Sequence, residues 1–203
     1  MKGAEEECER SLEEALKIDA DNVDALQTLG NLRLVRARDG EAKVALKRCV
    51  KVMLQDPSNL PPIDSRMVTC RLLVELECFK DAIKVLDTIV LDNDEMPEAW
   101  YLLAFSYFNL KKYLNAKECC KNVRTQMIKL KMDKDTDPSI LELKAGWEEV
   151  SKAIAKALGK KDLDSEDEQM KGGAGAEEEA EDDGFETMSE EDISEDEDAQ
   201  MKE

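Results

Sequence analysis

An all-α solenoid of antiparallel helix pairs is predicted by three features of the sequence. Similar blocks recur at a spacing of 34 residues, small residues stand at fixed places within each block, and prolines separate the blocks. The blocks cover residues 23–56, 63–96 and 97–130. In such a chain each helix pair packs only on its neighbours, so one continuous core is expected along the stack.

Each block places apolar or small side chains where the two helices of a pair would touch. These positions are Leu26, Leu29, Gly30, Ala42, Leu46 and Cys49 in the first block; Cys70, Leu73, Ala82, Leu86 and Ile89 in the second; and Trp100, Leu103, Ala104, Tyr107, Ala116, Cys120 and Val123 in the third. The pattern is that of tetratricopeptide repeats. Prolines in the stretch 57–62 break the helix and delay the second block by six residues, whereas Pro97 suits the first turn of a helix.

The two ends of the array are predicted to differ from the full repeats. Residues 4–20 fit only the second helix of a half repeat. Residues 140–158 form an amphipathic segment that is expected to cap the final repeat. The capping contacts are assigned to Leu141, Ala145, Val150, Ile154 and Leu158.

Charge divides the chain into a domain at 1–160 and an acidic tail at 161–203. The tail holds 20 acidic residues against 3 lysines, whereas the rest holds 28 acidic and 26 basic residues, so nearly all of the net charge of −19 lies in the tail. With little to bury and strong self-repulsion, the tail is expected to be disordered. Acids follow Ser165, Ser189 and Ser194, a context that suits acidophilic kinases. A tail that serves only solubility is the alternative.

Composition argues against catalysis and against several kinds of site. The chain has no histidine, so it cannot use a histidine general base. Six cysteines are present without a C-x-x-C pair, and no acidic run has the spacing of a calcium loop, so we expect no metal and no cofactor. No apolar run is long enough to span a membrane, and the first ten residues do not resemble a secretory signal. We expect a soluble monomer of the cytoplasm and nucleus that does not bind nucleic acid directly.

Recognition of a partner remains as the expected activity, and the repeat pattern predicts which side chains a partner would meet. The first helix of each repeat faces the concave groove. The groove residues are therefore Asp24, Gln27, Asn31, Leu34, Asp64, Met67, Arg71, Glu75, Glu98, Tyr101, Phe105, Phe108 and Asn109. Tyr101, Phe105 and Phe108 share one helix face, which is either an exposed aromatic stripe for a ligand or a surface that packs under the capping helix.

The groove residues favour a basic peptide as the ligand. Repeat proteins that clamp a terminal carboxylate place paired Lys, Asn and Arg on successive first helices, but here Gln27, Met67 and Tyr101 occupy those positions, and only Asn31 and Arg71 could serve. Acidic groove residues beside aromatic ones suit Lys and Arg side chains instead. The acidic tail would screen the same kind of ligand from nucleic acid.

The sequence resembles one known family, the dedicated assembly chaperones of the ribosomal large-subunit protein L-four. The similar segments are A-L-K-I-D-A-D-N-V-D-A-L-Q-T-L-G-N-L-R at 15–33, P-P-I-D-S-R at 61–66, E-A-W-Y-L-L-A-F-S-Y-F at 98–108 and the acidic D-D-G-F-E-T-M-S-E-E-D at 182–192. The resemblance covers roughly 12–123 and the tail. It implies a groove that holds the basic internal loop of the newly made ribosomal protein on its way to the nucleus. This chain has three full repeats, fewer than members of that family.

Three hypotheses about function follow. The first is a dedicated chaperone that binds a basic segment of the ribosomal protein L-four type in its concave groove and shields it until ribosome assembly, with binding that weakens in salt. The second is a general tetratricopeptide adaptor whose binding is insensitive to salt. The third is an acidic histone-type chaperone that acts through its tail.

Overall fold

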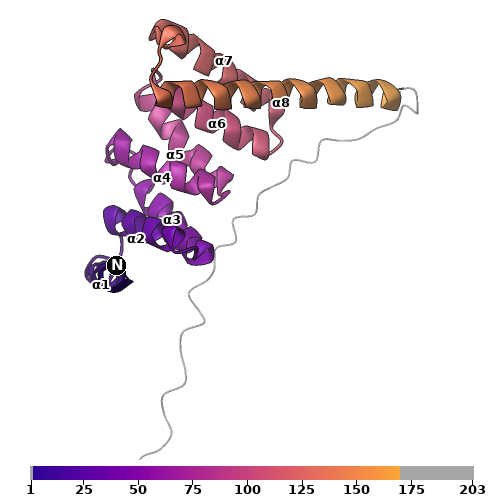
Figure 1. Ribbon diagram of the computed structural model, residues 1–203. Coiled ribbons are helices and arrows are strands. Elements are labelled where there is room, and N and C mark those ends of the chain that lie inside the picture. The colour runs from indigo at the N-terminus through magenta and orange to yellow at the C-terminus, as the bar shows by residue number, and fades with distance from the viewer. Residues whose placement is uncertain (1, 170–203) are drawn as a thin grey trace, which may run out of the picture.

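The computed structural model describes residues 2–169, which form eight α-helices and one short 3₁₀ helix. In chain order they are α1 (Lys2–Ile18), α2 (Val23–Val35), α3 (Asp39–Met53), α4 (Ile63–Glu75), α5 (Phe79–Asp92), α6 (Pro97–Asn109), α7 (Tyr113–Lys129), η1 (Met132–Lys134) and α8 (Pro138–Gln169). Figure 1 shows the helices stacked from α1 upward, with the long α8 lying across the last pair. Within residues 2–169 there is no β-strand.

The prediction of an all-α tetratricopeptide solenoid is confirmed. The pairs α2–α3, α4–α5 and α6–α7 begin at Val23, Ile63 and Pro97, which are the first residues of the three expected blocks. The division into a domain at 1–160 and a tail stays a prediction. Ser189 and Ser194 lie outside the described residues, as does the tail from residue 170 onward.

The core of the stack consists of the side chains that the 34-residue pattern selected. Leu46, Leu73, Leu86 and Leu103 each expose at most 1% of their surface. A Cβ added to Gly30 would lie 2.6 Å from the Cγ atom of Leu46, so α2 and α3 approach too closely there for a larger residue. Trp100 and Tyr107 are half-buried and border this core rather than fill it.

The turn inside each helix pair has the same geometry. Ala37, Glu77 and Lys111 each stand two positions after the last residue of the first helix and adopt φ values of 55°, 59° and 60°. The next amide donates back across the turn to the helix, as from the Cys78 nitrogen to the Leu73 oxygen at 2.8 Å. This is a Schellman motif with a residue other than glycine in the left-handed position.

The proline-bearing insert between α3 and α4 is fixed by a buried arginine. Arg66 exposes only 3% of its surface. Its Nε donates to the Pro61 oxygen at 2.9 Å, its Nη1 donates to Thr88 Oγ1 at 2.9 Å, and its Nη2 pairs with Asp92. The guanidinium therefore ties the insert to α5 and satisfies its own buried donors.

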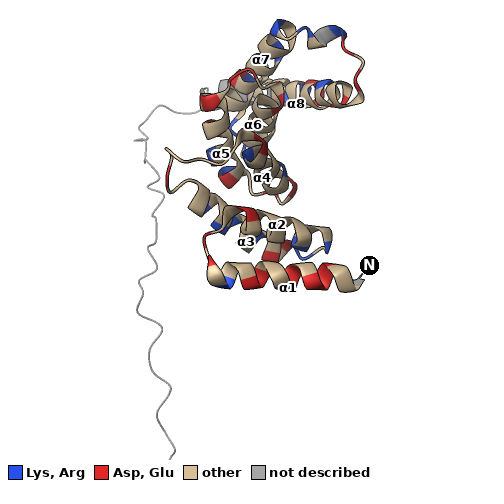
Figure 2. Cartoon of the chain, turned by 90° about the vertical axis from the view of Figure 1, so that its left-hand side faces the viewer, with Lys and Arg blue, Asp and Glu red and all other residues tan. Residues whose placement is uncertain are grey.

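Helix α1 docks on the first full pair largely through charge, with the half-buried Leu16 packed against the core. Glu5, Glu9 and Glu13 form one stripe along α1 at a spacing of four residues and face arginines of α2 and of the turn after it. Glu9 is the centre of this cluster, since its carboxylate accepts from Arg36 at 2.7 Å and from Arg38 at 2.8 Å. The red stretches of α1 and the adjacent blue residues appear in Figure 2.

The capping helix differs from the prediction in length and in orientation. It begins at Pro138 and its backbone stays helical to Gln169, past the expected end at 158. No proline interrupts this stretch, and its Lys, Glu and Gln residues favour helix, so Gly159 alone does not end it.

The residues of α8 that face the repeats are only partly those expected. Val150 and Ile154 are buried, with exposures of 6% and 2%, and Leu158 is half-buried. Leu141 and Ala145 are exposed, contrary to the prediction. Gly146 and Trp147 lie against the repeats instead, because the indole Nε1 of Trp147 donates to the Cys120 oxygen at 3.1 Å and turns α8 about its axis.

Candidate peptide-binding site

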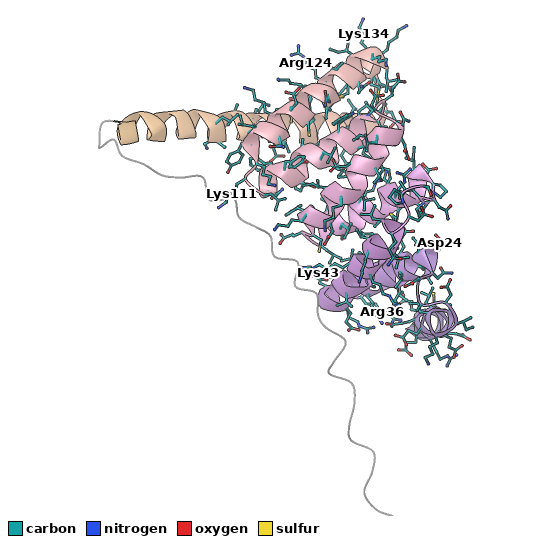
Figure 3. All side chains as sticks on the ribbon, turned by 180° about the vertical axis from the view of Figure 1, so that it is seen from behind. Asp24, Arg36, Lys43, Lys111, Arg124 and Lys134 are labelled. Atoms are coloured by element: carbon teal, nitrogen blue, oxygen red, sulfur yellow. The ribbon has the colours of Figure 1, made fainter. Side chains whose placement is uncertain are left out.

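The predicted groove residues fall into three groups by exposure. Asp24, Asn31, Asp64, Arg71, Glu75 and Asn109 are exposed; Gln27, Leu34, Glu98, Tyr101, Phe105 and Phe108 are half-buried; and Met67 is buried. They come from three separate helices of the stack, α2, α4 and α6, and Figure 3 shows Asp24 on the first of these. The predicted site is therefore spread over the stack and is not gathered at one point.

Two of the predicted contacts hold the repeats together. Met67 exposes 2% of its surface and belongs to the core, so its prediction as a groove contact was wrong. It stands on the face of α4 that packs against the neighbouring pair. Gln27 is half-buried and donates from Nε2 to the Ser65 oxygen at 2.8 Å and to Thr69 Oγ1 at 3.0 Å. Its amide joins α2 to α4, across the proline insert.

The aromatic residues of α6 neither form a free stripe nor lie together under α8. Phe105 meets Phe79 of α5 edge-on, with ring centroids 6.1 Å apart, and Tyr101 at 6.3 Å. Phe108 packs on Tyr113 at 5.8 Å. Asn109 is committed as well, because its Nδ2 donates to the Phe105 oxygen at 2.8 Å. Each ring stays half-buried, so part of its surface is accessible to a ligand.

Three predicted residues do meet in one place, a cleft of about 910 Å³ between α6 and α8. They are Arg71, Glu98 and Tyr101. The remaining lining comes from α6 and the two residues before it, from two residues that follow α7, and from the first half of α8, namely Glu95, Met96, Pro97, Leu102, Leu130, Met132, Ser139, Ile140, Glu142, Leu143, Ala145, Gly146 and Glu149. The cleft is open to solvent on one side and mostly apolar on its walls.

Tyr101 and Gly146 are in close contact in the wall of this cleft. A Cβ on Gly146 would lie 2.5 Å from the Tyr101 hydroxyl, so glycine lets α8 rest against the phenol. Burial raises the pKa of Tyr101, and the nearby Glu149 and Glu142 carboxylates raise it further. The hydroxyl therefore stays protonated at neutral pH and can donate to an acceptor in the cleft.

The cleft carries an excess of negative charge. Its only cation among the described lining residues is Arg71, whose Nε and Nη2 bind the Glu98 carboxylate at 2.6 and 2.8 Å. Glu95 pairs with Lys129 outside the cleft. Glu142 and Glu149 have no ion pair within residues 2–169. The walls can take the methylene stem of a Lys or Arg side chain while these carboxylates meet its charged end.

Sequence reasoning missed the two carboxylates from α8. Glu142 and Glu149 are seven residues apart and so lie on one side of the helix, a spacing that could have identified them. The amphipathic pattern of this segment predicts a cap and does not separate these two acids from the other polar residues of the helix.

Other reactive groups contribute no chemistry to the cleft. Burial raises the pKa of the Cys49 thiol to about 11 and those of Cys70 and Cys119 to about 12, so these thiols are protonated at neutral pH. Within the described part of the chain, no three metal-ligating side chains converge on one point. None of its helices is long and apolar enough to cross a bilayer.

Comparisons with known proteins point to one group. No protein-family model matches the sequence. A protein of Schizosaccharomyces pombe named probable assembly chaperone of rpl4 is 35% identical over 123 residues, which are 57% of this chain and 37% of that protein. A protein of the same name from Emericella nidulans is 34% identical over 103 residues, 49% of this chain and 27% of its own length.

A solved structure agrees with these relatives. The assembly chaperone of RpL4 (Acl4), residues 1–338, superposes with a TM-score of 0.50 at 30% identity and covers 55% of this chain and 41% of that one. The chain thus spans less than half the length of each of these proteins. The resemblance inferred from the sequence is confirmed: this chain is similar to proteins named as assembly chaperones of rpl4.

Proposed function

We propose that this protein is a chaperone that holds a basic segment of a newly made large-subunit ribosomal protein of the L-four (rpl4) type and shields it until ribosome assembly. The observation that carries the proposal is the 35% identity over 123 residues to a protein named for that role. It acts without turnover, because its task is to bind and release a partner. The general tetratricopeptide adaptor remains the alternative.

The cleft between α6 and α8 supports a basic ligand. Glu142 and Glu149 face it without an ion pair in the described residues, and Arg71 is already neutralised by Glu98. An incoming Arg side chain would form charge-assisted hydrogen bonds with these two carboxylates, and its methylene groups would contact the apolar walls. Arg71 and Glu98 would also serve as a switchable pair, since an arginine of the client can replace Arg71 on the same carboxylate.

The exposed residues along the stack would extend this site. Asp24, Asp64 and Glu75 stand on the first helices of the earlier repeats and attract Lys and Arg along the groove, while Phe105 and Phe108 offer partly accessible rings. Asn31 would contact the client backbone, and Asn109 would do so through its Oδ1, since its Nδ2 donates to the Phe105 oxygen. Gln27 stays a repeat-joining residue and would act by keeping α2 and α4 in line.

A binding experiment with one charge-reversal pair tests the proposal. The full chain is titrated with a purified ribosomal protein of the L-four type, and affinity is measured by fluorescence anisotropy. Glu149→Lys is expected to weaken binding about tenfold, since a rim attraction becomes a repulsion at a partly desolvated site. Glu148→Lys is the matched control, because Glu148 is the adjacent residue of α8 and lies outside the cleft.

Salt separates the proposal from its alternative. A client held by charge should bind more weakly at about 300 mM salt than at about 50 mM. The client of a general adaptor should have about the same affinity at both concentrations. Failure of the full chain to retain the ribosomal protein at low salt would remove the proposal. Equal losses of affinity for Glu148→Lys and Glu149→Lys would leave the identity of the client unchanged but would show that it binds outside the cleft.

The remaining expectations on partners and location form part of the same proposal. The protein would act as a monomer in cytoplasm and nucleus and would not bind nucleic acid or membranes directly. Light scattering of the free chain and microscopy of a tagged full-length protein test these points.

A further inference from the structure

A stripe of exposed side chains runs along one side of α7 and has no role in the candidate site. It consists of Leu114, Lys117, Lys121, Arg124 and Ile128, at intervals of three and four residues. Such intervals place all five on one face of the helix. The stripe therefore has three cations in the middle and an apolar residue at either end.

The apolar ends of the stripe are open to solvent. Leu114 exposes 73% of its surface and Ile128 exposes 58%. The cations between them are largely unneutralised, since Lys117 and Arg124 form no ion pair within residues 2–169 and only Lys121 meets an acid, Glu118, at 2.6 Å. Lys111 and Lys112 in the preceding turn add positive charge. Figure 3 shows Lys111 and Arg124 along this outer side.

One segment of this chain has the complementary composition. Residues 181–193 read E-D-D-G-F-E-T-M-S-E-E-D-I and hold seven acidic residues and no basic one. Phe185, the only aromatic residue after 160, and Ile193 stand on either side of four of those acids. An acidic stretch between two apolar residues matches a basic stretch between two apolar residues.

The two patterns also agree in length. Leu114 and Ile128 are 14 residues apart on a helix, which is about 21 Å along its axis. Phe185 and Ile193 are eight residues apart, which is at most about 28 Å for an extended chain. Phe185 can therefore lie at one end of the stripe while Ile193 lies at the other.

The chain between α8 and the acidic segment is long enough for this contact. The indole of Trp147 donates a hydrogen bond to the Cys120 oxygen in the middle of α7. From there α8 continues to Gln169, a further 22 residues or about 33 Å. Figures 1 and 3 show that this half of α8 projects past the Lys111 end of α7. Residues 169–185 bridge up to about 53 Å, enough to return to Leu114.

We propose that residues 181–193 dock on the α7 stripe of the same chain, with Phe185 near Leu114 and Ile193 near Ile128. Opposite charges bring the segment to α7, and the two apolar residues fix its position, since charge alone gives little preference for one placement. The inference does not depend on the client, because the contact is made within the free chain. A basic client would compete with α7 for the same acids.

Carbodiimide cross-linking of the full chain tests this contact, because it joins lysine amines directly to carboxylates. We expect cross-links from Lys117 and Lys121 to Glu186, Glu190 and Glu191. Phe185→Ser combined with Ile193→Ser leaves every charge in place and is expected to lower these cross-links about fivefold to tenfold. Met201→Ser is the matched control, an apolar change in the same acidic region outside the segment.

A second pair of variants tests the α7 side. Arg124→Glu should lower the cross-links of Lys117 by a similar factor, whereas Arg48→Glu on α3, which is also exposed, should not. Cross-links that spread evenly over the lysines of α3 and α7, or that ignore the Phe185 and Ile193 changes, overturn the proposal. So do cross-links that join isotopically distinct chains in a mixture, which would place a second copy there. RNA binding by the full chain that Arg124→Glu abolishes would assign the stripe to nucleic acid instead.

Discussion

The two ends of the described solenoid are covered by helices of opposite character. At one end, the carboxylates of α1 meet arginines of the next pair, with Glu9 only 9% exposed among them. At the other end, α8 covers α6 and α7 with Val150, Ile154 and the Trp147 ring. The first and last described helices thus attach to their neighbouring pairs by different means, α1 with ion pairs and α8 with apolar side chains. The stability contributed by α1 should therefore depend on pH and salt. The stability contributed by α8 should depend on the volume of its buried side chains.

Two opposing effects act on the pKa of Glu9, which are its burial and its contacts with arginines. Burial by itself raises the pKa of Glu9, but hydrogen bonds and charge from Arg33 and Arg38 outweigh it, so the pKa lies below its usual value. A lowered pKa in the folded state means that the carboxylate stabilises the fold above its usual pKa. That contribution is lost as the pH falls through the folded-state pKa.

The largest effect is expected at the apolar end. Ile154→Ala removes a side chain that is 2% exposed and should lower the free energy of unfolding by about 3 kcal/mol. It should also raise the reactivity of the Cys119 and Cys120 thiols as α8 detaches. Chemical unfolding and thiol labelling measure the two effects. Lys156→Ala, an exposed change on the same helix, should alter neither. A loss below about 1 kcal/mol would show that α8 rests on other contacts.

An intermediate effect is expected at the ionic end. Glu9→Gln leaves three arginines without their shared carboxylate and should cost about 2 kcal/mol at pH 7, between the values of exposed and buried ion pairs. The difference from the unchanged protein should hold from pH 7 to about 5 and shrink below the usual carboxyl pKa of 4.5. Urea unfolding at a series of pH values measures it.

The control for Glu9 lies two residues away. Glu7→Gln alters an exposed carboxylate whose contact with Arg10 is 3.8 Å long, so its effect should stay within about 0.5 kcal/mol. A loss for Glu9→Gln that persists undiminished at pH 3 would mean that packing, and not charge, holds α1.

A smaller effect is expected where α8 meets the cleft. Gly146→Ala places a Cβ against the Tyr101 hydroxyl and should cost about 1 kcal/mol, after the gain in helix propensity is allowed for. Tyr101→Phe removes the oxygen that is nearest to the new methyl group. If the clash is the cause, the double variant should be more stable than the sum of the single changes predicts, by thermal unfolding. Strict additivity would contradict this cause.

The smallest effect is a gain at the turns. Glu77→Gly should stabilise the protein by about 0.5–1 kcal/mol, because residue 77 has a φ of 59° that glycine adopts without strain. Calorimetry of Glu77→Gly beside Glu75→Gly provides the contrast, because residue 75 is the last residue of α4 and has helical backbone. The change at 75 should be destabilising. Loss of stability at both positions would show that the turn is not strained.

The fold could be predicted because it depends on the spacing of small and apolar residues along the chain. Much of the site depends instead on how each helix is rotated about its axis and on which side chains it meets. The 34-residue pattern identified Leu46, Leu73 and Leu103 as core residues, and all three are buried. It could not show that Met67 is buried, because a groove position and a packing position differ by a small turn of α4. The rotation of α8 about its axis could not be predicted for the same reason, since Gly146 and Trp147 decide it through contacts distant in sequence.

Buried charge was the second feature that spacing could not reveal. Nothing in the pattern distinguishes Arg66, which is inside, from Arg71, which is outside. Arg66 is buried because Pro61, Thr88 and Asp92 together satisfy its donors, and this requires three segments to meet.

The shared hydrogen-bonded turn at residues 37, 77 and 111 has a consequence for how such a protein changes length. Because each hairpin closes in the same way with alanine, glutamate or lysine at the bend, the bend itself places little demand on the sequence of a repeat. Changes in the number of repeats would therefore be limited by the contacts between hairpins, such as those of Gln27 and Arg66, and not by the bends within them.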